Sequence, residues 1–350
     1  MNAGRPSGTR VRAWWIVAAL GVLVASVTLA AMVGPVSLPP SGIWRSILDR
    51  LPFVEMDSGL TPRGDAILWE IRMPRVVLGV LVGSMLSAAG AAYQGVFRNP
   101  LADPYLLGAV AGAGLGATLA IAYIPNATEW LIDPLPLAAF IGGIVGVSLA
   151  YALGYSVRSG HTAVTLILAG VAVSAFLTAA QTLVQQRESD TLREVYSWIL
   201  GSLATASWFE VRLALPYVAV ALVVVVLGRR LMDVLAVGDV EAGSLGIRPD
   251  RVRLILVAFA TLGTAAVVAV TGLIGFVGII VPHTVRLLTG SSYRVIVPLS
   301  ILLGGAFLVV ADVVVRTVQS PYEIPIGVVT AFVGAPFFAV VMRTSRGVVS

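Results

Sequence analysis

Long apolar runs separated by short polar segments dominate the chain. A helix needs about 20 apolar residues to cross a bilayer, and these runs approach or reach that length. The runs are too long and too continuous for the strands of a membrane β-barrel. We therefore predict an all-α membrane protein, with one transmembrane domain over residues 1–350 and ten spans with soft edges: 13–34, 76–97, 104–124, 135–157, 162–185, 210–230, 254–271, 273–289, 295–315 and 324–342.

Two interruptions of the apolar pattern predict turns. Residues 254–285 contain no acidic residue or arginine over 32 positions, which is too long for one helix, and the glycines of TGLIGFVG (271–278) favour a break there. The first helix of the stretch 88–107 ends at Phe97. Arg98, Asn99 and Pro100 follow, so this stretch predicts a tight hairpin at the membrane surface.

Three polar stretches separate the spans. Residues 35–75 form a long outer segment, and 186–210 contain a core too short to span, typical of a surface or re-entrant helix. Residues 229–253 form the longest inner loop, in which spaced apolar residues and three glycines predict two short helices with a bend. This pattern favours a docking surface, with a membrane-surface amphipathic segment as the alternative.

The composition excludes several classes of protein. Only 12% of the residues are charged, about half the share in soluble proteins, so the solvent of this chain is largely lipid. All 23 cations are arginine, and without lysine there is neither a Walker A loop nor Schiff-base chemistry. There is no cysteine and there are two histidines, so we expect no metal site. The scattered arginines also argue against nucleic acid as a partner.

The distribution of arginine predicts the topology. With the N-terminus inside, the inner face holds fourteen arginines and five acids, against nine arginines and thirteen acids outside. This asymmetry favours cytoplasmic termini, with residues 1–12 as a cytoplasmic tail. The first span lacks a clear signal-peptidase site, so we interpret it as a retained helix.

Several long motifs occur in one order. They include IRMPR (71–75), AGAAYQGVFRNPLADPYLLGAVAGAGLG (89–116), WILGSL (198–203), LAVGDVEAGSLGI (235–247), TGLIGFVGIIVPHTVRLLTG (271–290) and EIPIGVVTAFVGAPFF (323–338). Through these motifs the chain resembles the FecCD permeases of type II ABC importers, which carry ferric siderophores, haem or cobalamin. SSYR (291–294) departs from the family's usual Asp-His-Arg type of sequence, and the first 68 residues carry little of the resemblance.

The resemblance implies an architecture and a set of partners. It implies about ten helices per subunit, a second copy of the same chain, two separate ATPase subunits inside and a substrate-binding protein outside. ATP and Mg²⁺ would then belong to the ATPase subunits, with no cofactor and no catalytic residue in this chain. The implied location is the bacterial cytoplasmic (inner) membrane. A ferric siderophore ranks first as cargo, with haem and cobalamin as alternatives.

The resemblance also implies site residues. Arg72, Arg75 and Arg316 match positions that dock the binding protein, with anchoring to lipid phosphate as the alternative. Asp312 lies one helical turn from Arg316, which predicts an intrahelical ion pair. The implied coupling loop for the ATPase comprises Leu235, Val237, Gly238, Ala242, Gly243, Leu245 and Gly246. The implied cytoplasmic gate comprises Asn99, Leu101, Ser159, Gly160, His161 and Thr162, for which the alternative is a plain turn and a polar loop.

Two other functions compete with a permease. An ion-coupled secondary transporter would need carboxylates near the midplane, and the ten predicted spans carry none there. A membrane enzyme would need a cluster of His, Asp, Glu or Cys, which the sequence does not provide. We therefore expect the permease subunit of an ATP-driven importer.

Overall fold

The computed structural model describes residues 12–52, 54–100, 102–124, 133–156 and 163–345. Within these ranges the chain forms only helices and loops. The helices are α1 (Ala13–Met32), α2 (Pro40–Asp49), α3 (Pro62–Ala66), α4 (Met73–Phe97), α5 (Ala109–Tyr123), α6 (Pro134–Ser156), α7 (Ala163–Arg187), α8 (Leu192–Ile199), α9 (Trp208–Val237), α10 (Asp239–Ser244), α11 (Pro249–Thr271), α12 (Val277–Thr289), α13 (Tyr293–Thr317) and α14 (Ile326–Ser345). Shorter helical turns lie at Ile67–Arg72, Pro104–Leu107 and Ser189–Thr191.

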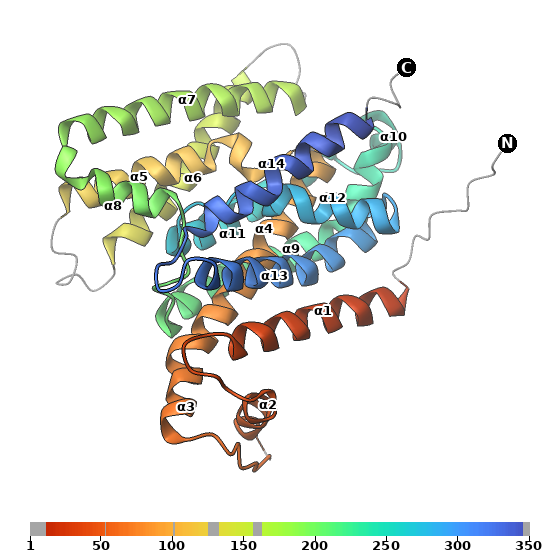
Figure 1. Cartoon of the computed structure of the whole chain (residues 1–350). Coiled ribbons are helices and arrows are strands. Elements are labelled where there is room, and N and C mark those ends of the chain that lie inside the picture. The colour runs from red at the N-terminus through yellow and green to blue at the C-terminus, as the bar shows by residue number, and fades with distance from the viewer. Residues whose placement is uncertain (1–11, 53, 101, 125–132, 157–162, 346–350) are drawn as a thin grey trace.

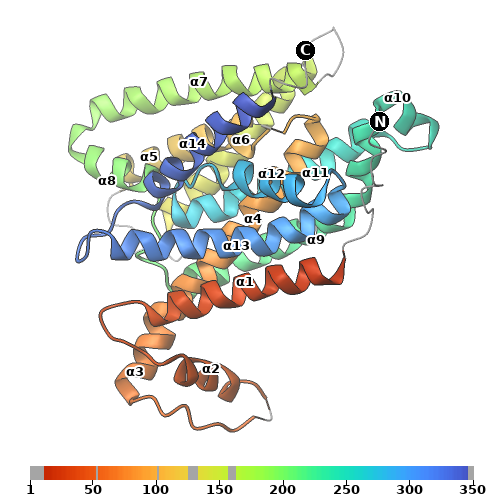
Figure 2. The same cartoon turned by 45° about the vertical axis from the view of Figure 1, so that its right-hand side comes forward.

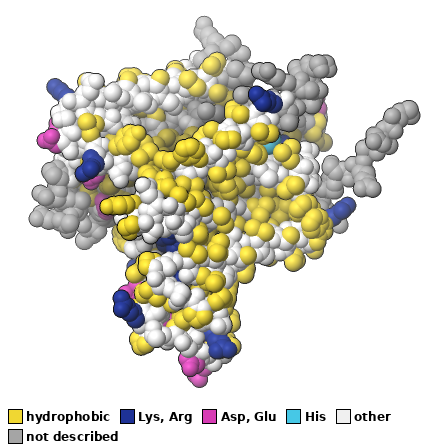
Figure 3. All heavy atoms as spheres, in the orientation of Figure 1, with side chains coloured by type: hydrophobic (Ala, Val, Ile, Leu, Met, Phe, Trp, Pro, Cys, Tyr) yellow, Lys and Arg dark blue, Asp and Glu magenta, His cyan; other side chains and the backbone are white. Residues whose placement is uncertain are grey.

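The membrane-spanning pattern is confirmed. Seven helices are long and apolar enough to cross a bilayer, and three shorter apolar helices, Ala109–Tyr123, Val277–Thr289 and Ile326–Val341, account for the other predicted spans. The start of α1, the end of α14 and α10 lie at one end of the bundle (Figures 1 and 2). Apolar side chains cover much of the face of the bundle shown in Figure 3.

Helix α4 is the centre of the bundle. It packs against α9, α11, α12 and α13, and all of its residues from Val82 to Phe97 are buried. Small residues allow this close packing. A Cβ atom on Gly90 would lie only 1.9 Å from the carbonyl oxygen of Gly278 in α12, so the two backbones meet there with no room for a side chain.

The segment after α4 corrects the predicted surface hairpin. Arg98 ends α4 in the left-handed region at φ 50°, but the chain then enters the protein, where Asp103 is only 3% exposed. Asp103 accepts a hydrogen bond from the backbone N–H of Tyr105 at 2.9 Å. The Tyr105 hydroxyl donates to the carbonyl of Ile274 at 2.5 Å. The segment after α4 therefore binds the backbone of Ile274, in the break between α11 and α12, which a turn at the membrane surface could not reach.

The outer segment 35–75 is more helical than its polarity suggests. Helices α2 and α3 project from the bundle (Figures 1 and 2) around a small apolar cluster that includes Ile43 and Leu68. The Ser46 hydroxyl donates to Asp65 at 2.6 Å and accepts from the Trp69 indole at 2.9 Å. From Pro62 onward the chain is continuously helical into α4.

The inner loop 229–253 also needs correction, because it contains one short helix and not two. Helix α9 continues to Val237, α10 spans six residues, and α11 already begins at Pro249. The polar stretch 186–210 contains the short helix α8, but residues 200–207 are not helical and α9 begins only at Trp208. The predicted break of the run 254–285 is confirmed between Thr271 and Val277.

Candidate functional site

The inner end of the bundle carries α10 as a separate projection (Figure 2). Gly238 interrupts the helical path after α9, and Gly246, at φ 77°, ends α10. The N–H of Ile247 donates to the carbonyl of Ala242 at 3.1 Å, and that of Gly246 to Gly243 at 2.9 Å. These bonds satisfy the last carbonyls of α10 and are typical of a glycine-capped helix end.

The predicted coupling residues divide into two groups. Leu235 and Ala242 are fully buried in the chain, so they cannot fill a groove on another protein, and that part of the prediction is wrong. Val237 and Leu245 are 72% and 70% exposed. Val240, which the sequence reasoning missed, is 82% exposed. Its position three residues after Val237 was the available signal.

An ion-pair cluster connects α10 to the end of α4. The Arg98 guanidinium donates to the Asp239 carboxylate and, at 2.6 Å, to the carbonyl of Leu235. Arg253 of α11 donates to the same Asp239 oxygen at 2.5 Å. Asp239 is the first residue of α10, so its carboxylate also complements the positive end of that helix. The cluster therefore ties α4, α10 and α11 together at one carboxylate.

The pKa of Asp239 reflects this environment. Partial burial by itself would raise the pKa, but the hydrogen bond and charge of Arg253, together with those of Arg98, outweigh it and lower the pKa below its usual value. Asp239 is therefore ionised throughout the neutral range, and the ion-pair cluster holds there.

The predicted gate is only partly described. Asn99 follows Arg98 directly, and its carbonyl accepts from the N–H of Ala102 at 3.0 Å. Leu101, Ser159, Gly160, His161 and Thr162 lie outside the described residues. The gate therefore stays a prediction, but its Asn99 end is attached to the ion-pair cluster through Arg98.

A second cluster of charges lies at the outer end of the bundle. Arg75 is 9% exposed and binds two carboxylates: its Nη2 donates to Asp312 at 2.7 Å and its Nη1 to Glu323 at 2.8 Å. Arg316 Nε lies 3.3 Å from Asp312, which confirms the intrahelical pair that the sequence predicts. Sequence spacing did not indicate that Arg75 joins Asp312 and Glu323.

The other two predicted docking residues bind the end of α1. Arg72 is 4% exposed and donates to the carbonyls of Ala31 and Met32 at 2.6 and 3.1 Å. Arg316 donates to those of Ala30 and Val33 at 2.9 and 3.2 Å. Cations at a helix C-terminus satisfy its last carbonyls and its dipole. All three guanidinium groups thus have partners within the chain, and their contact with a binding protein stays a prediction.

No group of three or more potential metal-ligating His, Asp or Glu side chains occurs among the described residues. His283, in α12, is 8% exposed, and its ring lies edge-on to Phe337 at 5.9 Å. This contact gives His283 a packing role between α12 and α14.

The chain thus combines apolar helices packed around the small residues of α4 with the projecting helix α10. The family model described as the FecCD transport family matches residues 22–344. The chain belongs to the FecCD family.

Sequence similarity to two curated permeases extends over most of their length. The chain is 42% identical over 286 residues to the cobalamin import system permease protein BtuC of Halobacterium salinarum, covering 81% of this chain and 75% of that protein. It is 34% identical over 331 residues to the iron(3+)-hydroxamate import system permease protein FhuB of Bacillus subtilis, covering 95% and 83%. A metal-chelate type ABC transporter in an inward-facing conformation matches with a TM-score of 0.81 and 25% identity, covering 94% of this chain and 98% of the other. The chain is thus a multi-pass permease of the FecCD family of ABC importers.

Proposed function

We propose that two copies of this chain form the pathway of an ATP-driven importer in the cytoplasmic membrane of a bacterium. Two separate ATPase subunits, which hold ATP and Mg²⁺, would bind the α10 projection, and an extracytoplasmic binding protein would deliver the cargo. The observation that carries the proposal is α10: a short helix with exposed apolar residues, tied to the end of α4 through Asp239, in a chain that matches the FecCD family over 22–344.

The α10 surface fits a protein partner. Val237, Val240 and Leu245 are each at least 70% exposed, at the end of the bundle that the predicted topology places in the cytoplasm. Their burial against an ATPase would contribute about 25 cal/mol per Å² of apolar surface. Movement of the ATPase would then reach the Arg98–Asn99 turn through Asp239 and Arg98.

The cargo is proposed to be a metal chelate. A ferric siderophore is our first candidate, and the relative at 34% identity is named for iron(3+)-hydroxamate import. Cobalamin is the second candidate, favoured by the 42% identity to a cobalamin import permease. Haem stays a further alternative from the family resemblance.

Reconstituted transport tests the proposal. The chain, its ATPase and its binding protein are placed in liposomes, and uptake of a radiolabelled ferric hydroxamate is compared with uptake of labelled cobalamin. We expect uptake of one chelate. This uptake should require ATP on the side of the membrane where the ATPase lies, and it should persist without an ion gradient. Uptake that follows a proton or sodium gradient without ATP would instead support a secondary transporter.

Docking of the binding protein is proposed at the outer cluster. A docking carboxylate has to compete with the existing partners of Arg75, of which Glu323 is the more accessible, with its side chain 34% exposed against 4% for Asp312. Glu323→Gln should therefore tighten docking if Arg75 takes part. An unchanged affinity in a low-salt pull-down would contradict this role of Arg75.

A further inference from the structure

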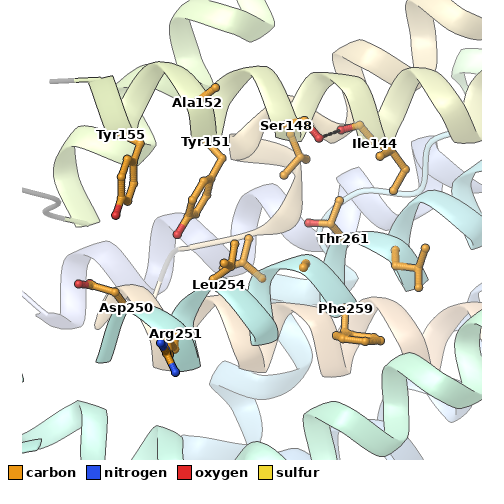
Figure 4. Close-up of a pocket in the computed structure, with 14 residues that line it drawn as sticks. Ile144, Ser148, Tyr151, Ala152, Tyr155, Asp250, Arg251, Leu254, Phe259 and Thr261 are labelled. Atoms are coloured by element: carbon orange, nitrogen blue, oxygen red, sulfur yellow. Dashed lines mark hydrogen bonds between the residues drawn. The ribbon is translucent and has the colours of Figure 1, made fainter. Parts of the chain in front are cut away.

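A groove opens between α6 and α11 (Figure 4). One wall is the face of α6 from Ile144 to Tyr155, and the other is the face of α11 from Asp250 to Leu262. The groove has a volume of about 780 Å³, within the range of about 300–1,000 Å³ typical of ligand pockets. Beyond its closed end the two helices touch, because a Cβ on Gly143 would lie 3.3 Å from that of Ala265.

The length of the groove matches one leaflet of a bilayer. The α6 wall covers eleven residue steps, or about 16 Å at 1.5 Å per residue, and the hydrocarbon core of a bilayer is about 30 Å thick. The open end lies where α6 ends at Ser156 and α11 begins at Pro249, on the predicted cytoplasmic side. With the predicted topology, this length and position correspond to the inner leaflet.

The polarity of the walls changes along this length. Apolar side chains such as Val257 and Leu262 line the deeper part. Toward the open end Tyr151 and Tyr155 project from α6 toward α11 (Figure 4). Tyrosines are typical of the level of lipid headgroups, because they join an apolar ring to a polar hydroxyl.

Arg251 is the cation among the residues that line the groove. The Asp250 carboxylate lies 3.4 Å from Arg253 Nη1, so its charge is partly balanced within the chain. Arg251 is exposed, and among the described residues no carboxylate lies within ion-pair distance of it. A guanidinium binds phosphate oxygens in a bidentate geometry, and basic pockets between spanning helices on the cytoplasmic side bind lipid headgroups.

We propose that the α6–α11 groove binds a glycerophospholipid of the inner leaflet. Its phosphate lies on Arg251, and one acyl chain follows Leu254 and Ala258 toward the closed end. The exposed position of Leu254 and Ala258 gives the chain access from the bilayer. The site is separate from the α10 projection and from the outer cluster, and it requires neither an ATPase nor a cargo.

Native mass spectrometry of the detergent-purified full chain tests the site, with added phosphatidylglycerol as the probe. Arg251→Gln should retain the lipid about tenfold more weakly, the loss expected for one charge-assisted hydrogen bond. Arg230→Gln removes an exposed arginine of α9 outside the groove and should retain lipid as the wild type does. Equal retention by the Arg251 variant and the wild type would overturn the proposal.

A second pair of variants tests the acyl-chain part. Ala258→Phe fills the groove, whereas Ile255→Phe enlarges an exposed residue of the same helix that does not line it. We expect lipid loss for the first variant only, and equal retention by both would refute the assignment. The natural chain has no cysteine, so Ala258→Cys provides a single cross-linking site. Efficient disulfide formation between two copies through this site would show that a second chain, and not lipid, covers the groove.

Discussion

Arg98, which caps the C-terminus of α4, forms an ion pair with Asp239, the first residue of α10. The pair joins the segment that carries the predicted gate to the helix that presents the predicted ATPase-binding residues. A second arginine, Arg253, holds the same carboxylate from α11. The Asp239 carboxylate therefore links α10 both to the end of α4 and to α11.

The first prediction concerns this link. Asp239→Asn should leave ATPase binding intact but lower the amount of chelate transported per ATP hydrolysed by several-fold, because a partly exposed ion pair contributes up to about 1 kcal/mol. Transport and ATP hydrolysis are measured together in liposomes. Asp250→Asn is the matched control, since Asp250 contacts only Arg253 of the cluster, at 3.4 Å. An unchanged ratio in the Asp239 variant would show that the pair does not transmit movement.

The second prediction concerns pH. The arginines lower the pKa of Asp239 in the folded chain, so its contribution to stability is present above the usual carboxylate pKa of about 3.9 and is lost as the pH falls through the lower, folded-state value. The wild type should therefore unfold at a higher temperature than Asp239→Asn at pH 7. The difference should disappear in acid, well below pH 4. A difference that grows as the pH falls would contradict this sign.

The third prediction concerns the α10 surface. Leu245→Asp should abolish stable ATPase binding, because docking would bury an unpaired carboxylate, while the permease still folds, since Leu245 is 70% exposed. Val318→Asp changes a side chain that is 66% exposed at the other end of the bundle and should bind the ATPase normally. Co-purification in detergent distinguishes the two. Normal ATPase binding and transport by the Leu245 variant would exclude α10 as the coupling element.

The fourth prediction concerns the outer cluster. Arg75→Leu leaves Asp312, which is 3% exposed, without its main partner, and should cost about 3–5 kcal/mol of stability. Arg50→Leu removes the exposed pair with Asp65 and the contact of the guanidinium with the Trp69 ring, and should cost about 1–2 kcal/mol. Thermal unfolding in detergent compares the two variants. Similar midpoints would mean that the Arg75 pairs contribute no more than a surface ion pair.

The fifth prediction concerns the contact of α4 with α12. Gly90→Val should push the backbones apart at the Gly278 carbonyl. Overpacking of this kind typically costs about 1–3 kcal/mol, and we expect a loss of stability of this size or larger. Gly21→Val is the control, because no atom lies within 4 Å of a Cβ at that position. The yield of monodisperse protein and the unfolding midpoint measure the effect. A normal midpoint for the Gly90 variant would show that the helices can separate there at little cost.

The sequence by itself determined the ten apolar spans, the end of α4 at Phe97, the break between Thr271 and Val277, and the absence of lysine and cysteine. These features depend on local hydrophobicity, on glycine and proline, and on residue type, all of which can be read within one or two helical turns. The motifs along the chain were also sufficient to indicate the family.

Only the tertiary structure decided which way particular side chains face. Leu235 and Leu245 belong to one apolar pattern, yet the first is buried and the second exposed, because Gly238 and Gly246 redirect the backbone between neighbouring helices. Arg75 and Asp312 are 237 residues apart, and no local pattern specifies such a pairing. Asp103, which a surface hairpin would expose, is buried because the segment that carries it folds back toward the break between α11 and α12. Contacts of this kind arise from the packing of whole helices, which a one-dimensional pattern constrains only through length and polarity.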